Sequence, residues 1–333
     1  MQITFVVPGL LQAVTLWQKD FAFQAQAPYL LQLFGQAERQ TLGVQGLIPT
    51  LFQFAGVTGQ EIPFAYYRYL TEFGHAPSTP LLCADPVYLQ TGVQEILLHP
   101  QLPELNSEQQ HALFNTLQPL LAEDGLSLIA HSSNHWYLSV PEQTQALPTQ
   151  TTPLNQALGQ GIYPLLAEGN KRYWHRLGNE LQMLLYQANV SQVNALWLWG
   201  VSPLPVTALP KQNGVVMGHS LTAQTYATAT QQTYQTATQW SALDPQNDYV
   251  IVLEDLQLPA LTDDMQAWQN VLNQYEQGWF APALEALNVG NAQISLSACD
   301  GDLWQVQAPR RSWKFWQKPP LATWDSLMPD VKA

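Results

Sequence analysis

Residues 194–200, Asn-Ala-Leu-Trp-Leu-Trp-Gly, constrain the fold more than any other stretch of the chain. In an extended strand, Trp197 and Trp199 would lie on one face and the two leucines between and before them on the other. A strand that is apolar on both faces is covered on both sides, which is typical of an α/β layer. Each indole can bury about 150–250 Å², worth roughly 4–6 kcal/mol at most. We therefore expect a buried core strand, which Gly200 ends.

Composition narrows the class of protein. The 333 residues suffice for one large or two ordinary domains, and 12 Trp, 13 Tyr and 11 Phe predict densely packed cores. The net charge of −13 disfavours nucleic acid as a partner, because phosphate binding depends on Lys and Arg, and it disfavours an anionic membrane surface. Cys83 and Cys299 lack CxxC spacing, so we expect two free thiols in a reducing compartment.

The first residues favour a strand over a targeting segment. Residues 1–9 have no basic region and are broken early by Pro8-Gly9, which is unlike a signal peptide. No run approaches the ~18 apolar residues that a membrane helix needs. The sequence therefore predicts a cytoplasmic protein without a transmembrane segment, whose first strand covers residues 3–7.

Strands and helices alternate in the last third of the chain, which predicts an α/β fold with a mainly parallel sheet flanked by helices. The expected elements are a strand at 214–217, a helix at 221–240, a strand at 249–253, a helix at 263–287 and a closing hairpin of 292–298 with 303–306.

The first two thirds divide at a breaker, residues 74–80 (Gly-His-Ala-Pro-Ser-Thr-Pro), where we place a domain boundary. Before it we expect helices at 27–34, 47–55 and 61–73. After it we expect a smaller αβ unit, with a strand at 81–89, its hairpin partner at 95–98, a helix capped by Asn106, strands at 126–130 and 136–140, a linker at 143–153 and an amphipathic helix at 171–187.

Four collinear stretches carry a resemblance to a known family: Leu-Leu-Cys-Ala-Asp-Pro-Val-Tyr-Leu at 81–89, the helix-to-strand unit 106–140, the block 194–200 and residues 249–287. The chain resembles the archaeal-type cofactor-independent phosphoglycerate mutases of the alkaline phosphatase superfamily, and most of all the proteobacterial RpfE-type regulatory proteins. The resemblance implies a phosphatase-like α/β core at 1–80 and 206–308, an inserted α/β domain at 81–205 and a basic, aromatic tail at 309–333.

Working members of that family transfer a phosphoryl group through a serine beside two divalent metals, which Asp and His side chains hold. Here the first strand ends in Val-Pro-Gly without a carboxylate, and no serine precedes Ser78. Thr41, Thr50 and Thr58 could donate a hydroxyl in its place. Thr41 and Thr58 are weak candidates for a nucleophile, and a turn or capping role is favoured for each of the three.

Fewer of the expected metal ligands are present. The strand at 249–253 is followed by Glu254 and Asp255, and the next strand end carries Asp300 and Asp302, while His219 is the last histidine. These four carboxylates could hold one Mg²⁺, because hard cations accept oxygen ligands, but a solvated loop is favoured. We expect no cofactor, and a divalent metal (Mg, Mn or Zn) only if the site is functional after all.

The phosphate-gripping residues of the family are changed too. The resemblance places an arginine at Cys83 and an Arg-His pair at Asn134-His135, and a thiol cannot grip a phosphate as an arginine does. The remaining candidates for binding a ligand are Asp85, His135, Lys171, Arg172, Arg176 and His219. A turn-stabilising histidine and a solvated basic helix face are the favoured alternatives for His135 and for the three cations.

Three hypotheses about function follow. The first is a catalytically degenerate mutase relative with a regulatory or interaction role and a protein partner. The second is a non-catalytic binder of a phosphorylated small molecule in the interdomain cleft, and the third is a phosphoryl-transfer enzyme with a rebuilt site. The segment 309–319 holds four of the twelve basic residues and three aromatics, and we expect it to dock on its own domain or to bind a partner or lipid surface.

Overall fold

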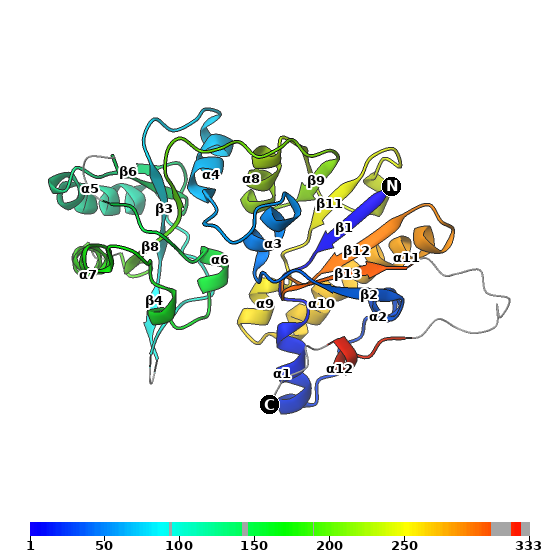
Figure 1. The fold of residues 1–333 in the computed structure, drawn as a ribbon. Helices are drawn as coiled ribbons and strands as arrows, with labels where there is room; N and C mark the ends of the chain where they lie inside the picture. Colours follow the sequence, from blue (N-terminus) through cyan, green and yellow to red (C-terminus); the bar gives the residue numbers. More distant parts are fainter. Residues whose placement is uncertain (93–94, 142–145, 189, 308–320, 328–333) are drawn as a thin grey trace. The chain divides into compact units, whose positions relative to one another are not determined.

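The structure is a computed structural model that describes residues 1–92, 95–141, 146–188, 190–307 and 321–327. Its contacts divide the chain into two compact units: unit 1, formed by Met1–Gly56 and Pro210–Ala333, and unit 2, formed by Val57–Leu209 (Figure 1). Among the described helices, none combines the length and the apolar character that crossing a bilayer requires.

Unit 1 is built on one sheet of seven strands. In chain order its elements are β1 (Gln2–Val6), α1 (Gln12–Phe21), α2 (Pro28–Gly35), β2 (Ala37–Thr41), α3 (Leu47–Phe54), β9 (Val215–Gly218), α8 (Leu221–Thr230), β10 (Thr233–Thr236), the 3-10 helix η2 (Trp240–Ala242), β11 (Tyr249–Val252), α9 (Gln257–Leu261), α10 (Met265–Tyr275), the π-helix η3 (Glu276–Phe280), α11 (Ala281–Asn288), β12 (Gln293–Ser297), β13 (Asp302–Val306) and α12 (Trp324–Leu327).

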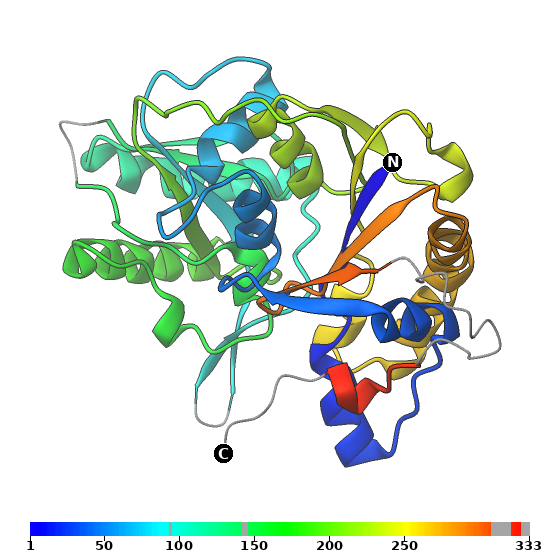
Figure 2. The same cartoon turned by 45° about the vertical axis from the view of Figure 1, so that its right-hand side comes forward.

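The strand order in this sheet is β10-β9-β11-β1-β12-β13-β2. The first five strands run parallel, with β1 in register Phe5↔Ile251 on one side and Phe5↔Leu296 on the other. The last two strands are antiparallel, and β13 and β2 lie side by side in Figure 2. The expected mainly parallel α/β sheet flanked by helices is therefore confirmed.

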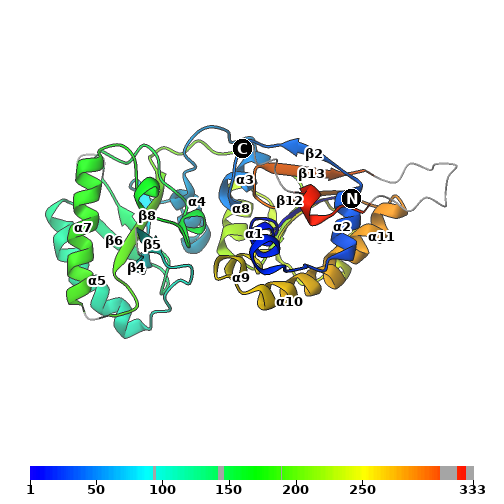
Figure 3. The same ribbon diagram turned by 90° about the horizontal axis from the view of Figure 1, so that it is seen from below.

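Helices cover both faces of the sheet in unit 1 (Figures 1 and 3). On one face, Ile3 and Phe5 share a core with residues of α1, α2, α10 and α11, among them the fully buried Trp17 and Trp268. On the other face lie α3 and α8, whose Phe52 and Tyr226 rings meet edge to face at 5.8 Å. Covering both faces explains why the interior strands β9 and β11 are apolar, whereas the edge strands β2 and β10 are polar and largely exposed.

Unit 2 holds a second, antiparallel sheet in the order β6-β7-β3-β8 and a separate two-stranded sheet of β4 and β5. Its elements are α4 (Phe64–Phe73), β3 (Leu81–Val87), β4 (Leu89–Thr91), β5 (Ile96–Leu98), α5 (Ser107–Glu123), β6 (Ser127–Ala130), β7 (Trp136–Ser139), α6 (Leu154–Ala157), the 3-10 helix η1 (Tyr163–Leu165), α7 (Lys171–Gln187) and β8 (Ala195–Ser202).

The stretch 194–200 forms most of β8, which lies at the edge of the antiparallel sheet in unit 2. Apolar side chains lie on both of its faces, as the sequence predicts. Trp197 and Trp199 are buried, and Trp199 stacks on Phe64 of α4 with ring centroids 4.9 Å apart. Leu196 and Leu198 pack on the opposite core, formed with α5 and α7. The strand is thus covered on both faces, although its sheet is antiparallel.

The division between the units differs from the expected domain boundaries. We expected residues 1–80 in the core and an insert at 81–205, but α4 packs on β3 and β8, and the contacts divide the chain after Gly56 and before Pro210. The physical reason is a charged contact: Arg68 of α4 pairs with Asp85 of β3 inside unit 2. The breaker at 74–80 is therefore a loop within unit 2.

Several elements differ from the expected ones in extent. The expected helix at 221–240 ends at Thr230, because Gln231 adopts a left-handed conformation (φ 56°) and the chain returns as β10. The expected helix at 263–287 is α10, η3 and α11 in succession, with the π-helix between the two α-helices. The cap at Asn106 is confirmed, as Asn106 and Gln109 form a capping box.

Most of the basic, aromatic segment 309–333 lies outside the described residues, including all of 309–319. Residues 321–327 pack on unit 1: Trp324 is buried, and its Nε1 donates to the Ala25 carbonyl at 2.8 Å. Leu327 is buried in the same core.

Candidate functional site

The parallel strands of unit 1 end together at one edge of the sheet. β1 is followed by Val7-Pro8-Gly9, β11 by Leu253 and Glu254, and β12 by Ala298 and Cys299. In open α/β sheets, ligands bind beyond the carboxyl ends of the strands. We use the name strand-end site for Thr50, Ser220, Glu254, Cys299 and Asp300, the polar and thiol side chains gathered around these ends.

Glu254 and Ser220 form the first pair of the strand-end site. Ser220 caps α8 by accepting from the Ala223 amide at 3.1 Å, and its hydroxyl hydrogen-bonds to the Glu254 carboxyl. Burial raises the pKa of Glu254 to about 7; the Ser220 hydrogen bond lowers it and the neighbouring Asp255 raises it further. Near neutral pH, the Glu254 carboxyl is therefore divided between its protonated and its charged form.

Cys299 and Thr50 form the second pair. Both side chains are buried, and the Thr50 hydroxyl of α3 lies beside the Cys299 thiol with no hydrogen-bond partner among the described residues. Burial raises the pKa of Cys299 well above that of an ordinary thiol, and the Thr50 contact lowers it only in part. Since the thiolate is the nucleophile and the metal ligand, a thiol held in its neutral form is inert in both roles.

The other carboxylates near the strand ends have partners of their own. Asp302 Oδ2 accepts from Arg39 Nε at 2.8 Å and from Nη2 at 2.5 Å. Asp255 Oδ2 accepts from the Tyr275 hydroxyl at 2.9 Å. Burial raises the pKa of Asp300. Glu254, Asp255, Asp300 and Asp302, the four candidates for a metal, are thus engaged separately, and the described residues contain no group of three His, Cys, Asp or Glu side chains that could hold a metal ion.

The end of β1 is filled by backbone. Gly9 has φ +79°, and a Cβ there would lie 2.8 Å from the Leu256 carbonyl oxygen and from Gln257 Cα. The Gly9 carbonyl accepts from Trp268 Nε1 at 2.8 Å. A close-packed turn therefore occupies the place at which the resemblance implied an acidic ligand.

The structure separates the candidate hydroxyls. Thr41 is exposed at the end of the edge strand β2, and Thr58 is exposed in unit 2. Neither belongs to the strand-end site, whereas the buried Thr50, which the sequence did not favour, does. His219 is exposed directly before Ser220, at the start of α8.

A buried ion pair is the strongest electrostatic feature of unit 2. Arg68 Nη1 donates to Asp85 Oδ2 at 2.8 Å, and Nη2 donates to the Trp136 carbonyl at 2.7 Å; both charged side chains are almost wholly buried. Asp85 also accepts from Trp199 Nε1 at 2.7 Å and from the Trp136 amide at 3.3 Å. The Arg68 guanidinium lies 4.6 Å from the Tyr137 ring centroid, in cation–π geometry.

The same network reaches the surface through Glu72. Its carboxylate accepts from the Tyr137 hydroxyl and lies 2.8 Å from His135 Nδ1. Burial raises the pKa of Glu72, but the hydrogen bonds from His135 and Tyr137 and the charge of Arg68 outweigh it, so the pKa is lowered overall. Glu72 therefore accepts hydrogen bonds as a carboxylate.

These contacts change the interpretation of the candidate ligand-binding residues. Asp85 is enclosed by Arg68 and Trp199, and His135 is paired with Glu72, so each contributes to the packing of unit 2. Of the basic side chains on α7, Lys171 lies 3.2 Å from Glu168, Arg176 lies 3.6 Å from Glu180, and Arg172 is exposed. The structure does not gather these residues into one anion site.

Arg68 and Glu72 are the functional-looking residues that the sequence did not reveal. They are four residues apart and therefore lie on one face of α4. That spacing, on a helix otherwise rich in aromatics, is the signal that would have found them. Arg68 also explains Cys83: the thiol is buried beside the ion pair, and burial raises its pKa.

Comparison with known proteins extends these observations. No protein-family model and no curated protein matches the chain. Among solved structures, the PH0037 protein from Pyrococcus horikoshii is similar over 98% of this chain and 91% of its own, with 10% identity and a TM-score of 0.50. A cofactor-independent phosphoglycerate mutase from Thermoplasma acidophilum DSM 1728 matches 92% of this chain and 88% of its own, with 11% identity and a TM-score of 0.41. At 10% identity, the likeness to PH0037 concerns the fold alone.

Proposed function

We propose that the chain is a non-catalytic protein on a phosphoglycerate mutase-like fold, with a regulatory or interaction role of the kind that the RpfE-type resemblance implies. The observation that carries the proposal is the pairing of side chains in the strand-end site. Ser220 hydrogen-bonds to Glu254, and Thr50 lies buried against the Cys299 thiol, at the sheet edge where a phosphoryl-transfer enzyme needs metal ligands and an activated hydroxyl.

The charges of the site support the proposal. Two divalent cations need several ionised carboxylates close together, since hard cations take most of their ligands from oxygen anions. Here the pKa of Glu254 is about 7, so much of this carboxyl is neutral at physiological pH. Asp255 and Asp302 are held by Tyr275 and Arg39. A binuclear centre would have to displace these partners.

The surroundings of the candidate hydroxyl nucleophiles also support the proposal. A hydroxyl attacks phosphorus only when a base or a metal draws off its proton. Thr50 is fully buried, and the Cys299 thiol beside it has a pKa that burial raises, which leaves Thr50 without access to substrate and without a base. Thr41 is exposed and lies opposite Asp302 in the β2–β13 ladder, where Arg39 holds the Asp302 carboxylate, and Thr58 is an exposed residue of unit 2.

The test is an assay of purified full-length protein for phosphoglycerate interconversion and for generic phosphatase activity, with Mg²⁺, Mn²⁺ or Zn²⁺ and with an active archaeal-type mutase as the positive control. We expect no metal-dependent turnover. A rate above about 1 s⁻¹, which is ordinary for enzymes, would overturn the proposal if Thr50→Ala or Glu254→Ala abolished it. A rate that both variants retain would point to a contaminating enzyme.

Thermal unfolding of the same purified protein tests the alternative role, the binding of a phosphorylated metabolite. A ligand that binds only the folded state raises the melting temperature. With the candidate cations on α7 paired or dispersed, we expect no shift with inorganic phosphate or phosphoglycerate at millimolar concentration. A saturable shift that Arg172→Gln removes would support the anion-binding role instead.

A further inference from the structure

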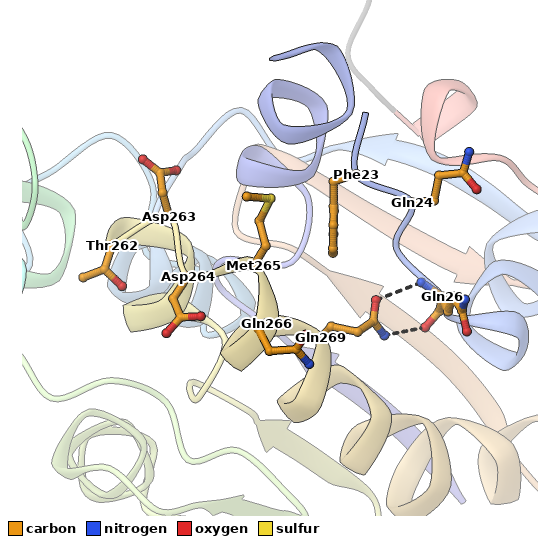
Figure 4. Close-up of a pocket in the computed structure, with 9 residues that line it drawn as sticks. All are labelled: Phe23, Gln24, Gln26, Thr262, Asp263, Asp264, Met265, Gln266 and Gln269. Carbon is orange, nitrogen blue, oxygen red and sulfur yellow. Dashed lines mark hydrogen bonds between the residues drawn. The ribbon is translucent and has the colours of Figure 1, made fainter. Parts of the chain in front are cut away.

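Unit 1 contains a pocket that none of the functions considered above uses. It has a volume of about 840 Å³ and lies between the segment after α1 and the start of α10 (Figure 4). Small-molecule sites usually have volumes of about 300–1,000 Å³. The lining residues are Phe23, Gln24, Gln26, Thr262, Asp263, Asp264, Met265, Gln266 and Gln269.

The walls of the pocket are fixed by hydrogen bonds. Gln269 uses both ends of its side-chain amide, accepting from the Gln26 amide and donating to the Gln26 carbonyl, each at 2.9 Å (Figure 4). On the opposite wall, Asp263 Oδ1 accepts from Trp17 Nε1 at 2.8 Å. The Gln26–Gln269 bonds join the two segments that form the pocket, and the Trp17 bond holds Asp263 against α1, so a ligand would meet a preorganised surface.

An aromatic cluster supports the apolar part of the lining. The Phe23 ring packs edge to face on Trp17 at 5.6 Å and on Trp268 at 6.2 Å. Both indoles are fully buried in the core of unit 1. Phe23 stands beside Met265 in Figure 4, so an aromatic ring and a thioether offer an apolar wall to a ligand.

The polar part of the lining has one sign of charge. It includes two carboxylates, Asp263 and Asp264, and four glutamines, but no lysine, arginine or histidine. Asp264 Oδ1 accepts from the Ala267 amide as the cap of α10, and no partner for Oδ2 is found in the described part of the chain. A lining that combines two carboxylates with an apolar wall favours an organic cation, which gains charge-assisted hydrogen bonds, and it disfavours an anion.

We propose that this pocket binds a small organic cation, with a primary ammonium or guanidinium group on a short aliphatic body. The cationic head pairs with the Asp264 carboxylate and with the side of the Asp263 carboxylate that faces away from Trp17. The aliphatic body lies against Phe23 and Met265, and the glutamine amides hydrogen-bond to any further polar groups of the ligand. The proposal does not depend on the absence of catalysis at the strand-end site, which is formed by other residues.

Titration calorimetry of the full chain tests the proposal, with n-butylamine, agmatine and spermidine as probes. Matched probes are n-butanol, which is neutral, and butyrate, which is an anion. We expect saturable binding of one cation per chain, with an affinity that falls as salt is added, because screening weakens attraction between charges. Binding of n-butanol as tight as that of n-butylamine would overturn the proposal, as would no saturable binding of any cation at millimolar concentration.

Variants distinguish binding in the pocket from attraction to the overall negative charge of the protein. Asp263→Asn with Asp264→Asn removes two charges but keeps the acceptor for Trp17 and a good cap for α10. We expect the affinity for agmatine to fall about tenfold or more, the loss of one charge-assisted hydrogen bond. Phe23→Leu keeps an apolar wall and should weaken binding less.

The control is Glu38→Gln with Glu285→Gln, two exposed side chains outside the pocket that change the net charge of unit 1 by the same amount. We expect agmatine affinity in this variant to match that of the unaltered protein. An equal loss in the control and in the double aspartate variant would show diffuse attraction and overturn the proposal. The melting temperature of each variant verifies that it is folded.

Discussion

At the scale of single residues, Arg68 and Asp85 form a buried ion pair inside unit 2. A charge taken out of water is stabilised only by good partners, and losing one partner from such a pair costs about 3–5 kcal/mol. Arg68→Met should therefore lower the free energy of unfolding by about that amount, since Asp85 would stay buried with only Trp199 and Trp136 as donors. Urea unfolding followed by tryptophan fluorescence measures the change.

The matched variant is Arg68→Met combined with Asp85→Asn. Asparagine is neutral and still accepts from the Trp199 indole, so the double variant should recover part of the lost stability. If Arg68→Met alone cost less than about 1 kcal/mol, the value for an exposed pair, the ion pair would not be buried as described.

The raised pKa of Glu254 predicts how the stability of the protein depends on pH. Its pKa is about 7 in the folded chain, against about 4.3 for an ordinary glutamate, so the folded state binds the proton more tightly than the unfolded state. The stability contributed by Glu254 is then greatest below about pH 4.3 and is lost as the pH rises through about 7. Above about pH 7 the folded state carries the cost of burying an ionised Glu254, and Glu254→Gln removes that cost. The variant should therefore be more stable than the unaltered protein by about 1–3 kcal/mol at alkaline pH, allowing for solvent screening.

Urea midpoints across pH 5 to 8 check this, because the difference between the two proteins isolates Glu254 from other carboxyls with raised pKa values, such as Glu61 and Glu276. We expect the difference between the two curves to grow as the pH rises from 5 to 8, because Glu254 ionises over this range. Parallel curves would mean that Glu254 titrates as an exposed side chain.

At the scale of elements, β8 and α4 approach each other at Gly200. This residue has φ +62°, and a Cβ on it would lie 3.1 Å from Phe64 Cβ and 3.2 Å from the Ala65 nitrogen. Gly200→Ala combines a left-handed conformation with a tight contact, and we expect it to lower stability by about 1–3 kcal/mol. Gly178 lies within α7 with nothing near its Cβ position, so Gly178→Ala should raise stability by about 0.5–1 kcal/mol.

Thermal unfolding of the two alanine variants gives the comparison directly, because the chemical change is the same and only the environment differs. Opposite shifts of the melting temperature are expected. A destabilised Gly178→Ala together with an unchanged Gly200→Ala would contradict both the close approach of α4 to β8 and the open surface of α7.

How much of each element the sequence predicts depends on where its decisive contact lies. The cap at Asn106 and the helix at 171–187 depend on neighbours within a few residues, and both are found as predicted. The break between α10 and α11 is different. Glu276 of the π-helix accepts from the amides of Tyr29 and Leu30, almost 250 residues earlier in the chain, and no local pattern reveals that contact.

The candidate site shows the same limit. The sequence marks the strand ends after β11 and β12 correctly, because runs of buried residues followed by acidic ones are local features. It does not show that Thr50 meets Cys299, that Arg39 holds Asp302, or that Arg68 encloses Asp85. Each of these contacts joins different elements, so Asp85 and Asp302, which looked available for ligands, are already paired within the protein.

At the scale of the whole molecule, the division into two units makes the last prediction. Unit 2 is continuous in sequence, has its own core between its sheet and helices α5 and α7, and includes α4, which supplies Arg68 and Phe64. A fragment of residues 57–209 should therefore fold alone with cooperative thermal unfolding, as a domain with its own core can. A fragment of residues 81–205, which follows the breaker in the sequence, lacks α4.

The shorter fragment should fail to fold cooperatively, because it leaves the Asp85 carboxylate without its counterion and removes Phe64 from the face of the buried Trp199. Near-ultraviolet circular dichroism reports the packing of the indoles in both fragments. If residues 81–205 unfolded as cooperatively as residues 57–209, α4 would be an attachment and the boundary expected at the breaker would be the correct one. If neither fragment folded, unit 2 would depend on unit 1 for its stability.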